Sequence, residues 1–155
     1  MPDDLSAAVT SVDTWLDSTL DSVDAAEIAV LESASRAGID EEEMHKLGMA
    51  VRESVVNAVV HGNRYSSHKK VHLTVTCGAD RVRVMIVDEG DGFERSQVPD
   101  PLAEENLLRQ SGRGLLLIQA FVDEFSVQPA TPRGTQVTLT KYLGPSARPR
   151  EFIRP

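Results

Sequence analysis

Three polar side chains recur at helical spacing in the stretch Arg52–Gly62, whose other residues after Arg52 are apolar or small. Glu53, Asn57 and His61 lie at i, i+4 and i+8, so a helix would align them on one narrow stripe. A helix that is apolar nearly all round should be buried, and a buried carboxylate and amide then need a partner. A hydrated cation carrying phosphate would serve; the alternative is a polar pair that satisfies itself.

The first two residues of this stripe suit phosphate chemistry. Mg²⁺ takes a few protein oxygens and keeps waters and substrate phosphates as its other ligands, so the single amide oxygen of Asn57 can suffice. Glu53 lies one turn earlier and is placed to act as a general base near that metal. These two residues are therefore equally consistent with a site for Mg²⁺ and phosphate and with a buried polar pair that satisfies itself.

A second candidate site follows an expected strand, in the segment Asp88-Glu89-Gly90-Asp91-Gly92. Gly90 and Gly92 permit positive φ and the close approach of a flat ligand. The Asp88 carboxylate, at the strand end, can accept a hydrogen bond from an exocyclic amine. The alternative is an ordinary acidic turn.

A third candidate site is Gly112-Arg113-Gly114, which opens an apolar helix. Free N–H groups at a helix start bind anions, and Arg113 can point at phosphate. The alternative is a flexible helix entry with a solvated arginine. The sequence contains no P-loop motif and no Gly-x-Gly-x-x-Gly after a strand.

The elements that must position these residues alternate between helical and strand periodicity. Helices packed on one face of a mainly antiparallel sheet make a two-layer α+β sandwich, which is the fold we predict. The expected elements are a strand at Thr14–Asp21, a helix capped by Ser22 or Asp24 that runs to about Ala37, a central helix from Asp40 to Gly62, a hairpin at Lys70–Val87, a helix at Leu115–Glu124, and a hairpin of Phe125–Gln128 with Thr135–Tyr142.

We expect one domain, residues 14–143, between a flexible N-terminus (1–13) and a flexible C-terminal tail (144–155). Within it, Glu94–Ser111 contains Pro99 and Pro101 and shows little periodicity. A segment of this length in a compact domain is either disordered or a functional lid.

The net charge of −8 argues against a general nucleic-acid binder and fits better with a basic protein partner. Met1–Glu43 holds twelve acidic residues against Arg36 alone, which makes either a solvated acidic face or a docking surface. The single cysteine, Cys77, excludes an intrachain disulfide. With neither a signal peptide nor an apolar run of membrane length, these features indicate a cytoplasmic protein without membrane contact.

Together the motifs resemble the Bergerat-fold ATPases, which include histidine kinases, gyrases and heat-shock chaperones. The resemblance covers about Thr14 to Leu143, and the stretch from Pro99 to Gly114, with the small size, is similar to the anti-sigma-factor serine/threonine kinases. The motifs that carry it are Glu53-x-x-x-Asn57…His61-Gly62, Asp88-x-Gly90-x-Gly92-Phe93, Gly112-x-Gly114-Leu115 and Gly134-Thr135.

The resemblance implies that ATP and Mg²⁺ bind under a mobile lid and that phosphate passes to Ser or Thr of an anti-sigma-factor antagonist. It also implies a homodimer that sequesters a sigma factor. In the roles that it implies, Asn57 holds Mg²⁺, Glu53 is the base, Asp88 reads the adenine amine with Thr135 nearby, Gly90 and Gly92 shape the adenine pocket, and Gly112, Arg113, Gly114 and Leu115 meet the phosphates.

Two other classes of function stay open at this point. The chain can be an ATP-binding regulatory module that holds a protein partner without phosphotransfer, because a fold does not fix a function. It can also be the catalytic part of a histidine kinase. That class needs a phosphoacceptor histidine on a pair of dimerising helices, and we expect no room for one before Glu41.

Overall fold

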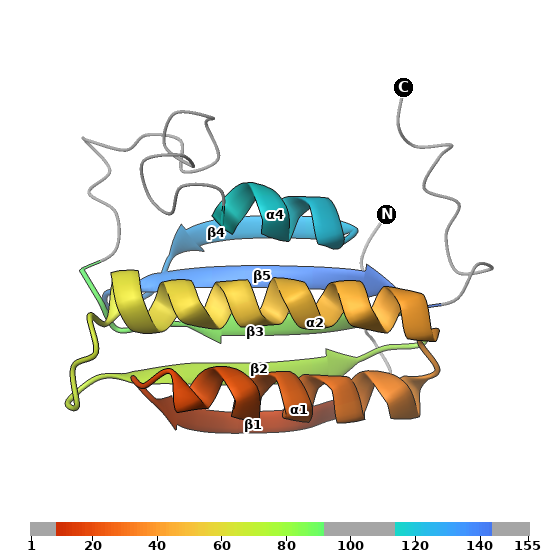
Figure 1. Ribbon diagram of the computed structural model, residues 1–155, viewed down its shortest axis with the longest axis horizontal. Helices are drawn as coiled ribbons and strands as arrows, with labels where there is room; N and C mark the ends of the chain where they lie inside the picture. Colours follow the sequence, from red (N-terminus) through yellow and green to blue (C-terminus); the bar gives the residue numbers. More distant parts are fainter. Residues whose placement is uncertain (1–8, 92–113, 144–155) are drawn as a thin grey trace.

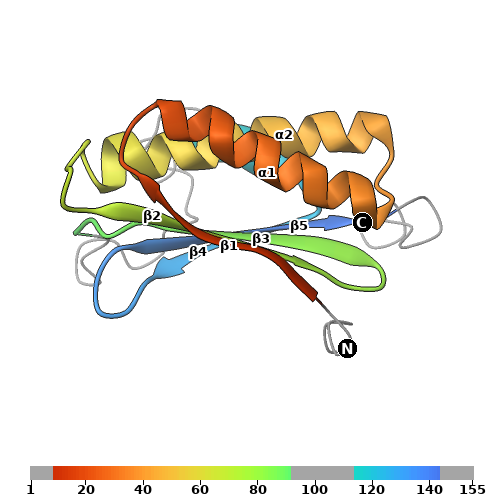
Figure 2. The same ribbon diagram turned by 90° about the horizontal axis from the view of Figure 1, so that it is seen from below.

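The computed structural model describes residues 9–91 and 114–143. They form a five-stranded antiparallel sheet in the order β1-β2-β3-β5-β4, with the helices on one face (Figures 1 and 2). The predicted α+β sandwich is thereby confirmed. The elements are β1 (Val9–Asp17), α1 (Asp21–Ala37), α2 (Glu41–Val56), the π-helical turn η1 (Asn57–Gly62), β2 (Lys70–Cys77), β3 (Arg81–Val87), α4 (Gly114–Phe121), β4 (Glu124–Pro129) and β5 (Thr135–Tyr142).

Local signals set the junction between α1 and α2. Gly38 ends α1 with φ of 96°, a left-handed conformation that favours glycine, and its N–H group donates to carbonyls of the last helical turn. Asp40 then caps α2, because its Oδ1 atom accepts a hydrogen bond from the N–H group of Glu43 at 2.9 Å. The predicted helix end and helix start are both confirmed.

Several expected boundaries differ from the structure. The helix expected to be capped by Ser22 or Asp24 is α1, which already begins at Asp21 and has Leu20, a residue without a capping side chain, at its N-cap position. The strand expected at Thr14–Asp21 is β1, Val9–Asp17, which begins and ends earlier because its pairing with β2 stops where Asp17 meets Lys70. The domain boundary that we set at residue 14 therefore falls within β1. Likewise, the helix expected at Leu115–Glu124 ends at Phe121, since Glu124 already pairs in β4.

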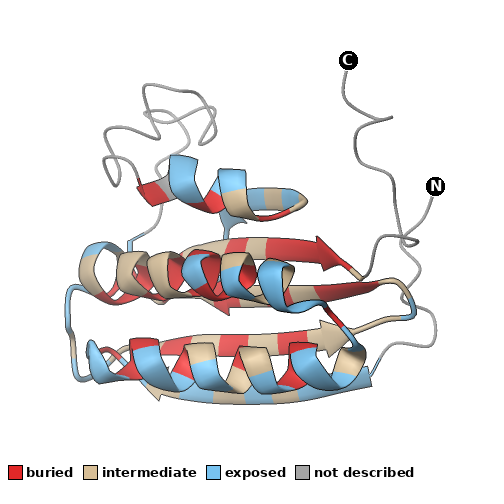
Figure 3. Ribbon diagram, turned by 45° about the vertical axis from the view of Figure 1, so that its right-hand side comes forward, coloured by how far each residue is buried: buried red, intermediate tan, exposed pale blue. Residues whose placement is uncertain are grey.

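The core lies between the helices and the inner face of the sheet. Buried and exposed residues alternate around α1 and α2, with the buried ones directed at the strands (Figure 3). The strands contribute aliphatic side chains at every second position, as in Val71, Leu73 and Val75 of β2. Burial of such aliphatic side chains, at about 1.5–3 kcal/mol each, is the main force that holds helices and sheet together.

One charged side chain lies among these aliphatic residues. Lys141 of β5 is only 1% exposed, and its Nζ atom lies 2.5 Å from Glu43 Oε1 and donates to the Phe121 carbonyl at 3.1 Å. Burial alone favours neutral Glu43, but hydrogen bonds and charges of Lys141 and Lys46 prevail and hold its pKa below the ordinary value. Lys141 of β5 therefore joins the start of α2, through its ion pair with Glu43, to the end of α4, through the Phe121 carbonyl.

No helix in the described parts of the chain is both long enough and apolar enough to cross a lipid bilayer.

Candidate functional site

The site begins where the central helix changes its winding. After Val56 the chain continues as the π-helical turn η1, which starts at Asn57 and ends at Gly62. The N–H group of Asn63 closes this turn on the Ala58 carbonyl at 2.8 Å, five residues earlier. Such turns are rare and occur frequently at functional sites.

Glycines allow this helix end and the segment after β3 to touch. A Cβ atom added to Gly62 would lie 2.3 Å from Oδ2 of Asp88, and one added to Gly90 would lie 2.1 Å from the Gly62 carbonyl oxygen. On the other side, a Cβ on Gly134, where φ is 102°, would lie 2.0 Å from the Asp88 carbonyl oxygen. We call these three glycines around Asp88 the glycine cradle, and only residues without a side chain fit it.

The cradle holds the Asp88 carboxylate in one orientation. Its Oδ1 atom accepts hydrogen bonds from the N–H groups of Gly90 at 2.9 Å and Thr135 at 3.1 Å. The Asp88 N–H group donates in turn to the Thr135 carbonyl at 3.0 Å. Within residues 9–91 and 114–143 no group donates to Oδ2, so this second oxygen can accept a hydrogen bond from a ligand.

Burial also changes the acidity of this carboxyl. Asp88 is only 6% exposed, and burial raises its pKa above the ordinary value, although the two N–H groups that it accepts from oppose the shift. A buried carboxylate with one oxygen fixed and the other available is well suited to accept from an amine group of a flat, partly apolar ligand.

Asn57 and Glu53 lie one helical turn apart and are both half-buried. The Nδ2 atom of Asn57 is buried and lacks a hydrogen-bond partner among the described residues. A buried amide without a partner costs free energy, so a ligand at this position would relieve that cost. The alternative of a polar pair that satisfies itself therefore finds no support in Asn57.

The donor set around Asn57 fits Mg²⁺ in one particular way. Across the described ranges, no three His, Cys, Asp or Glu side chains converge as a metal cluster. An Mg²⁺ ion here would accordingly be held by the Asn57 amide oxygen, waters and ligand phosphates, a combination that this ion accepts. Asn57 would hold the ion, and Glu53 would remain available for proton transfer.

Asn63 is the residue of this site that the sequence did not reveal. It is 1% exposed, and its Oδ1 atom accepts from the Glu89 N–H group at 2.7 Å. Its Nδ2 atom donates to Ser18 Oγ at 2.9 Å and to the Lys70 carbonyl at 3.0 Å. An asparagine after a helix-ending glycine indicates a turn, which is the only signal that the sequence offers.

The structure thus brings Asp88, Gly90 and Thr135 into direct hydrogen-bonded contact. Glu53 lies in the last turn of α2, and Asn57 begins η1, whose last residue, Gly62, touches Asp88.

The predicted phosphate contacts lie only partly within the described structure. Gly114 is buried at the start of α4. This helix packs against α2 and begins at the end of the molecule where β3 ends (Figure 1). The side chain of Leu115 is not described. Gly92, Gly112 and Arg113 lie outside the described residues, as does the predicted lid, Glu94–Ser111.

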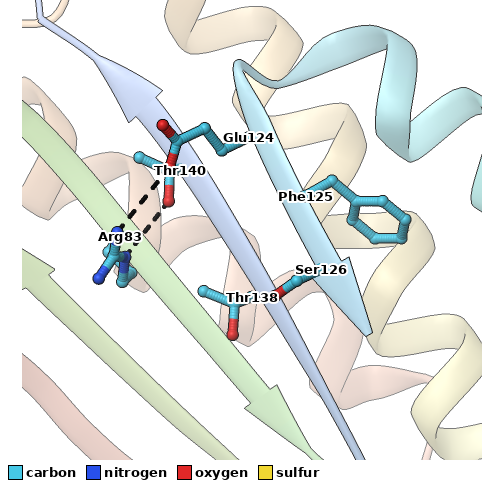
Figure 4. A pocket seen from close by; sticks show the side chains of 6 residues that line it. All are labelled: Arg83, Glu124, Phe125, Ser126, Thr138 and Thr140. Atoms are coloured by element: carbon cyan, nitrogen blue, oxygen red, sulfur yellow. Dashed lines mark hydrogen bonds and ion pairs between the residues drawn. The ribbon is translucent and has the colours of Figure 1, made fainter. Parts of the chain in front are cut away.

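A separate pocket of about 350 Å³ lies on the sheet itself (Figure 4). Arg83 donates there to Thr140 Oγ1 at 3.3 Å and lies 4.0 Å from Glu124, so the protein itself holds this cation. Along β3 and β5 these residues alternate with core residues, which directs them to the face that the helices leave uncovered. The lining residues are Arg83, Glu124, Phe125, Ser126, Thr138 and Thr140. This pocket is therefore distinct from the Asp88 site.

Comparison with known proteins defines the class to which this fold and site belong. Residues 16–141 match the family described as the histidine kinase-like ATPase domain, which covers nearly all of the described structure. The chain therefore belongs to the histidine kinase-like ATPase family, and this membership implies ATP binding.

Individual relatives identify the branch of that family. The chain is 30% identical over 123 residues to an anti-sigma F factor of Oceanobacillus iheyensis, covering 78% of this chain and 84% of the relative. It is 34% identical over 116 residues to the serine-protein kinase RsbW of Bacillus subtilis, covering 71% of each chain. An anti-sigma F factor of Bacillus subtilis is 32% identical over 107 residues, covering 68% and 73%. The branch is that of the anti-sigma-factor-like serine kinases.

Proposed function

We propose that this protein is an anti-sigma-factor serine/threonine kinase. It binds ATP with Mg²⁺, phosphorylates an anti-sigma-factor antagonist on Ser or Thr, and sequesters a sigma factor in a partner switch. In this proposal it works in the cytoplasm as a homodimer and binds neither nucleic acid nor membrane. The names of its relatives, an anti-sigma F factor and a serine-protein kinase, support the proposal.

The observation that carries the proposal is the buried Nδ2 atom of Asn57, which has no partner among the described residues, one turn after Glu53. In the proposal Nδ2 of Asn57 donates to a phosphate oxygen of the nucleotide, and the Oδ1 atom of the same amide would hold Mg²⁺, which when bound would neutralise phosphate charge. Glu53 accepts the proton of the incoming Ser or Thr hydroxyl. The hydroxyl oxygen then bonds to the γ-phosphorus while the bond between that phosphorus and the ADP oxygen breaks.

The adenine end of the nucleotide is assigned to the glycine cradle. Oδ2 of Asp88 accepts the hydrogen bond of the adenine amine, with Thr135 beside it. Gly90 and Gly92 shape the adenine pocket in this proposal; Gly90 does so by its close packing on Gly62 and by its N–H bond to Asp88 Oδ1, which together fix the carboxylate. The start of α4 receives the phosphates in this proposal, because free N–H groups at a helix start favour anions. Its residues in that role are Gly112, Arg113, Gly114 and Leu115.

The test is phosphate transfer from labelled ATP to candidate antagonist proteins. Glu53→Gln preserves the shape of the side chain but removes the base, so we expect transfer to fall by about 10²- to 10⁴-fold while ATP binding stays nearly intact. Asn57→Ala removes a metal ligand, so it should lose the Mg²⁺-dependent part of ATP binding as well as transfer. A circular-dichroism melt of each variant shows whether it is folded.

The result can also favour a regulatory module over a kinase. If the wild-type protein binds ATP and an antagonist but transfers no label, and Glu53→Gln holds the antagonist as tightly as wild type, the kinase assignment fails. An ATP-binding module that holds its partner without phosphotransfer would then be the function of this site.

A further inference from the structure

Asn63 joins four parts of the chain at the edge of the Asp88 site. It follows the end of the central helix, and its side chain reaches the β1–α1 connection at Ser18, the first residue of β2 at Lys70, and the segment after β3 at Glu89. Both hydrogens of Nδ2 have acceptors, and Oδ1 has a donor. At 1% exposure the amide is thus fully satisfied by the protein, in contrast to Asn57.

The bond to Glu89 bears directly on Asp88. The Glu89 N–H group and the Asp88 carbonyl belong to one rigid, planar peptide unit. Asn63 Oδ1 holds the N–H side of this unit at 2.7 Å, and its carbonyl side lies against Gly134, at the point where a Cβ would be 2.0 Å away. The peptide plane is thereby fixed from two sides, and with it the direction in which the Asp88 side chain leaves the backbone.

Other hydrogen bonds around Asn63 hold the β1–α1 connection, the start of β2 and the segment after β3 together, and they do not involve that peptide unit. The Glu89 carboxylate accepts from the Lys70 N–H group at 2.6 Å, and Ser18 Oγ donates to the Lys69 carbonyl at 2.5 Å. Loss of the Ser18 hydroxyl would therefore weaken the contact between the β1–α1 connection and the start of β2. It would leave the hydrogen bond from the Glu89 N–H group to Asn63 Oδ1 in place. Comparing the loss of Ser18 with the loss of Asn63 therefore shows whether Asn63 acts on the Asp88 carboxylate or only stabilises the fold.

We propose that Asn63 is a positioning residue that sets the base selectivity of the nucleotide site. By holding the Glu89 N–H group it keeps the Asp88 carboxylate aimed at the exocyclic amine of adenine; guanine presents a carbonyl oxygen there, which a carboxylate repels. The inference rests on the proposed reading of adenine by Asp88, and it assigns to Asn63 the geometry on which that reading depends.

The experiment measures dissociation constants of ATP, GTP and inorganic tripolyphosphate by calorimetry with Mg²⁺ present, on the full chain. The variants are Asn63→Ala and Asn63→Ser, and Ser18→Ala is the control. The shorter side chain of Asn63→Ser leaves room for a water that can bind the Glu89 N–H group and the Lys70 carbonyl. We expect the preference for ATP over GTP to fall by about 10-fold or more in both Asn63 variants, because a hydrogen bond to a charged group is misaligned. Tripolyphosphate affinity should be unchanged, and Ser18→Ala should keep the wild-type preference.

Each other outcome counts against the inference. A folded Asn63 variant with the wild-type preference refutes it, and so does Ser18→Ala with the same loss of preference, because the hydrogen bonds around Asn63 as a whole would then be responsible. If neither Asn63 variant folds even with ATP, Asn63 is a residue of the fold alone. A wild-type protein that binds ATP and GTP equally refutes the adenine assignment of Asp88 itself, which is a separate failure.

Discussion

Replacing Gly62 by alanine would place a methyl group where the Asp88 carboxylate lies. The added Cβ would be 2.3 Å from Asp88 Oδ2 and 2.5 Å from its Cγ, far inside van der Waals contact. Asp88 cannot move away without breaking the hydrogen bonds that its Oδ1 atom accepts from Gly90 and Thr135. The substitution therefore disrupts the glycine cradle.

The magnitude follows from those two bonds. Hydrogen bonds to a charged group contribute about 1.5–3 kcal/mol each, so breaking both costs about 3–6 kcal/mol. Alanine regains about 1 kcal/mol over glycine from helix propensity. We expect Gly62→Ala to lower the free energy of unfolding by about 2–5 kcal/mol, and to abolish detectable ATP binding in whatever fraction remains folded, because the displaced carboxylate no longer meets the adenine.

Gly48 of α2 offers a matched control. A Cβ there would lie 2.9 Å from Glu27 Oε2, the far end of a flexible side chain, which can move aside. Gly48→Ala should therefore be neutral or stabilising by up to about 1 kcal/mol and should leave ATP binding unchanged. Urea unfolding followed by circular dichroism, with calorimetric ATP titration, compares the two variants. Equal stability and equal ATP affinity in both would refute the packing of Gly62 on Asp88.

Two further predictions concern buried charges. Because burial raises the pKa of Asp88 above its ordinary value of 3.8, the stability that this group contributes is present below that value and lost as pH rises through the folded-state pKa. ATP affinity should change in the opposite direction, falling on acidification through the same range, whereas calorimetry on Asp88→Asn should show no such dependence. In the second prediction, Lys141→Met removes the buried charge, while Glu43 keeps its partner Lys46 and stays partly exposed to water. The free energy of unfolding, measured in urea, should therefore change by only about 1 kcal/mol. Glu43→Gln instead leaves the Lys141 charge buried and should cost about 3 kcal/mol; equal losses in both variants would contradict this account.

The elements that the sequence predicted well are those with local signals. Gly38 and Asp40 set the turn between α1 and α2 through contacts within a few residues. The hairpin of β2 and β3 was predicted from alternation on both sides of a turn, and the observed strands keep that alternation. Asp88 and Gly90 were chosen as neighbours in sequence, and the structure joins them directly by a hydrogen bond.

The features that the sequence did not reveal depend on distant partners. The position of β1 is set by its register with β2, more than fifty residues later, because Asp17 pairs with Lys70. Asn63 acquires its role from Glu89, which is 26 residues away. Lys141 occupies an inward position of β5 that alternation would assign to an aliphatic residue, and its partner Glu43 lies on another element. Periodicity reports which face a residue occupies, but not which side chain it meets there.

The central claim is that the Asp88 carboxylate binds the adenine of ATP, and calorimetric titration of wild type and Asp88→Asn with ATP and with inorganic tripolyphosphate tests it most directly. An amide in place of the carboxylate loses a charge-assisted hydrogen bond from the adenine amine, so we predict that ATP affinity falls by about 10-fold or more while tripolyphosphate affinity stays the same. Unchanged ATP affinity in the variant, or an equal loss for both ligands, would contradict the claim.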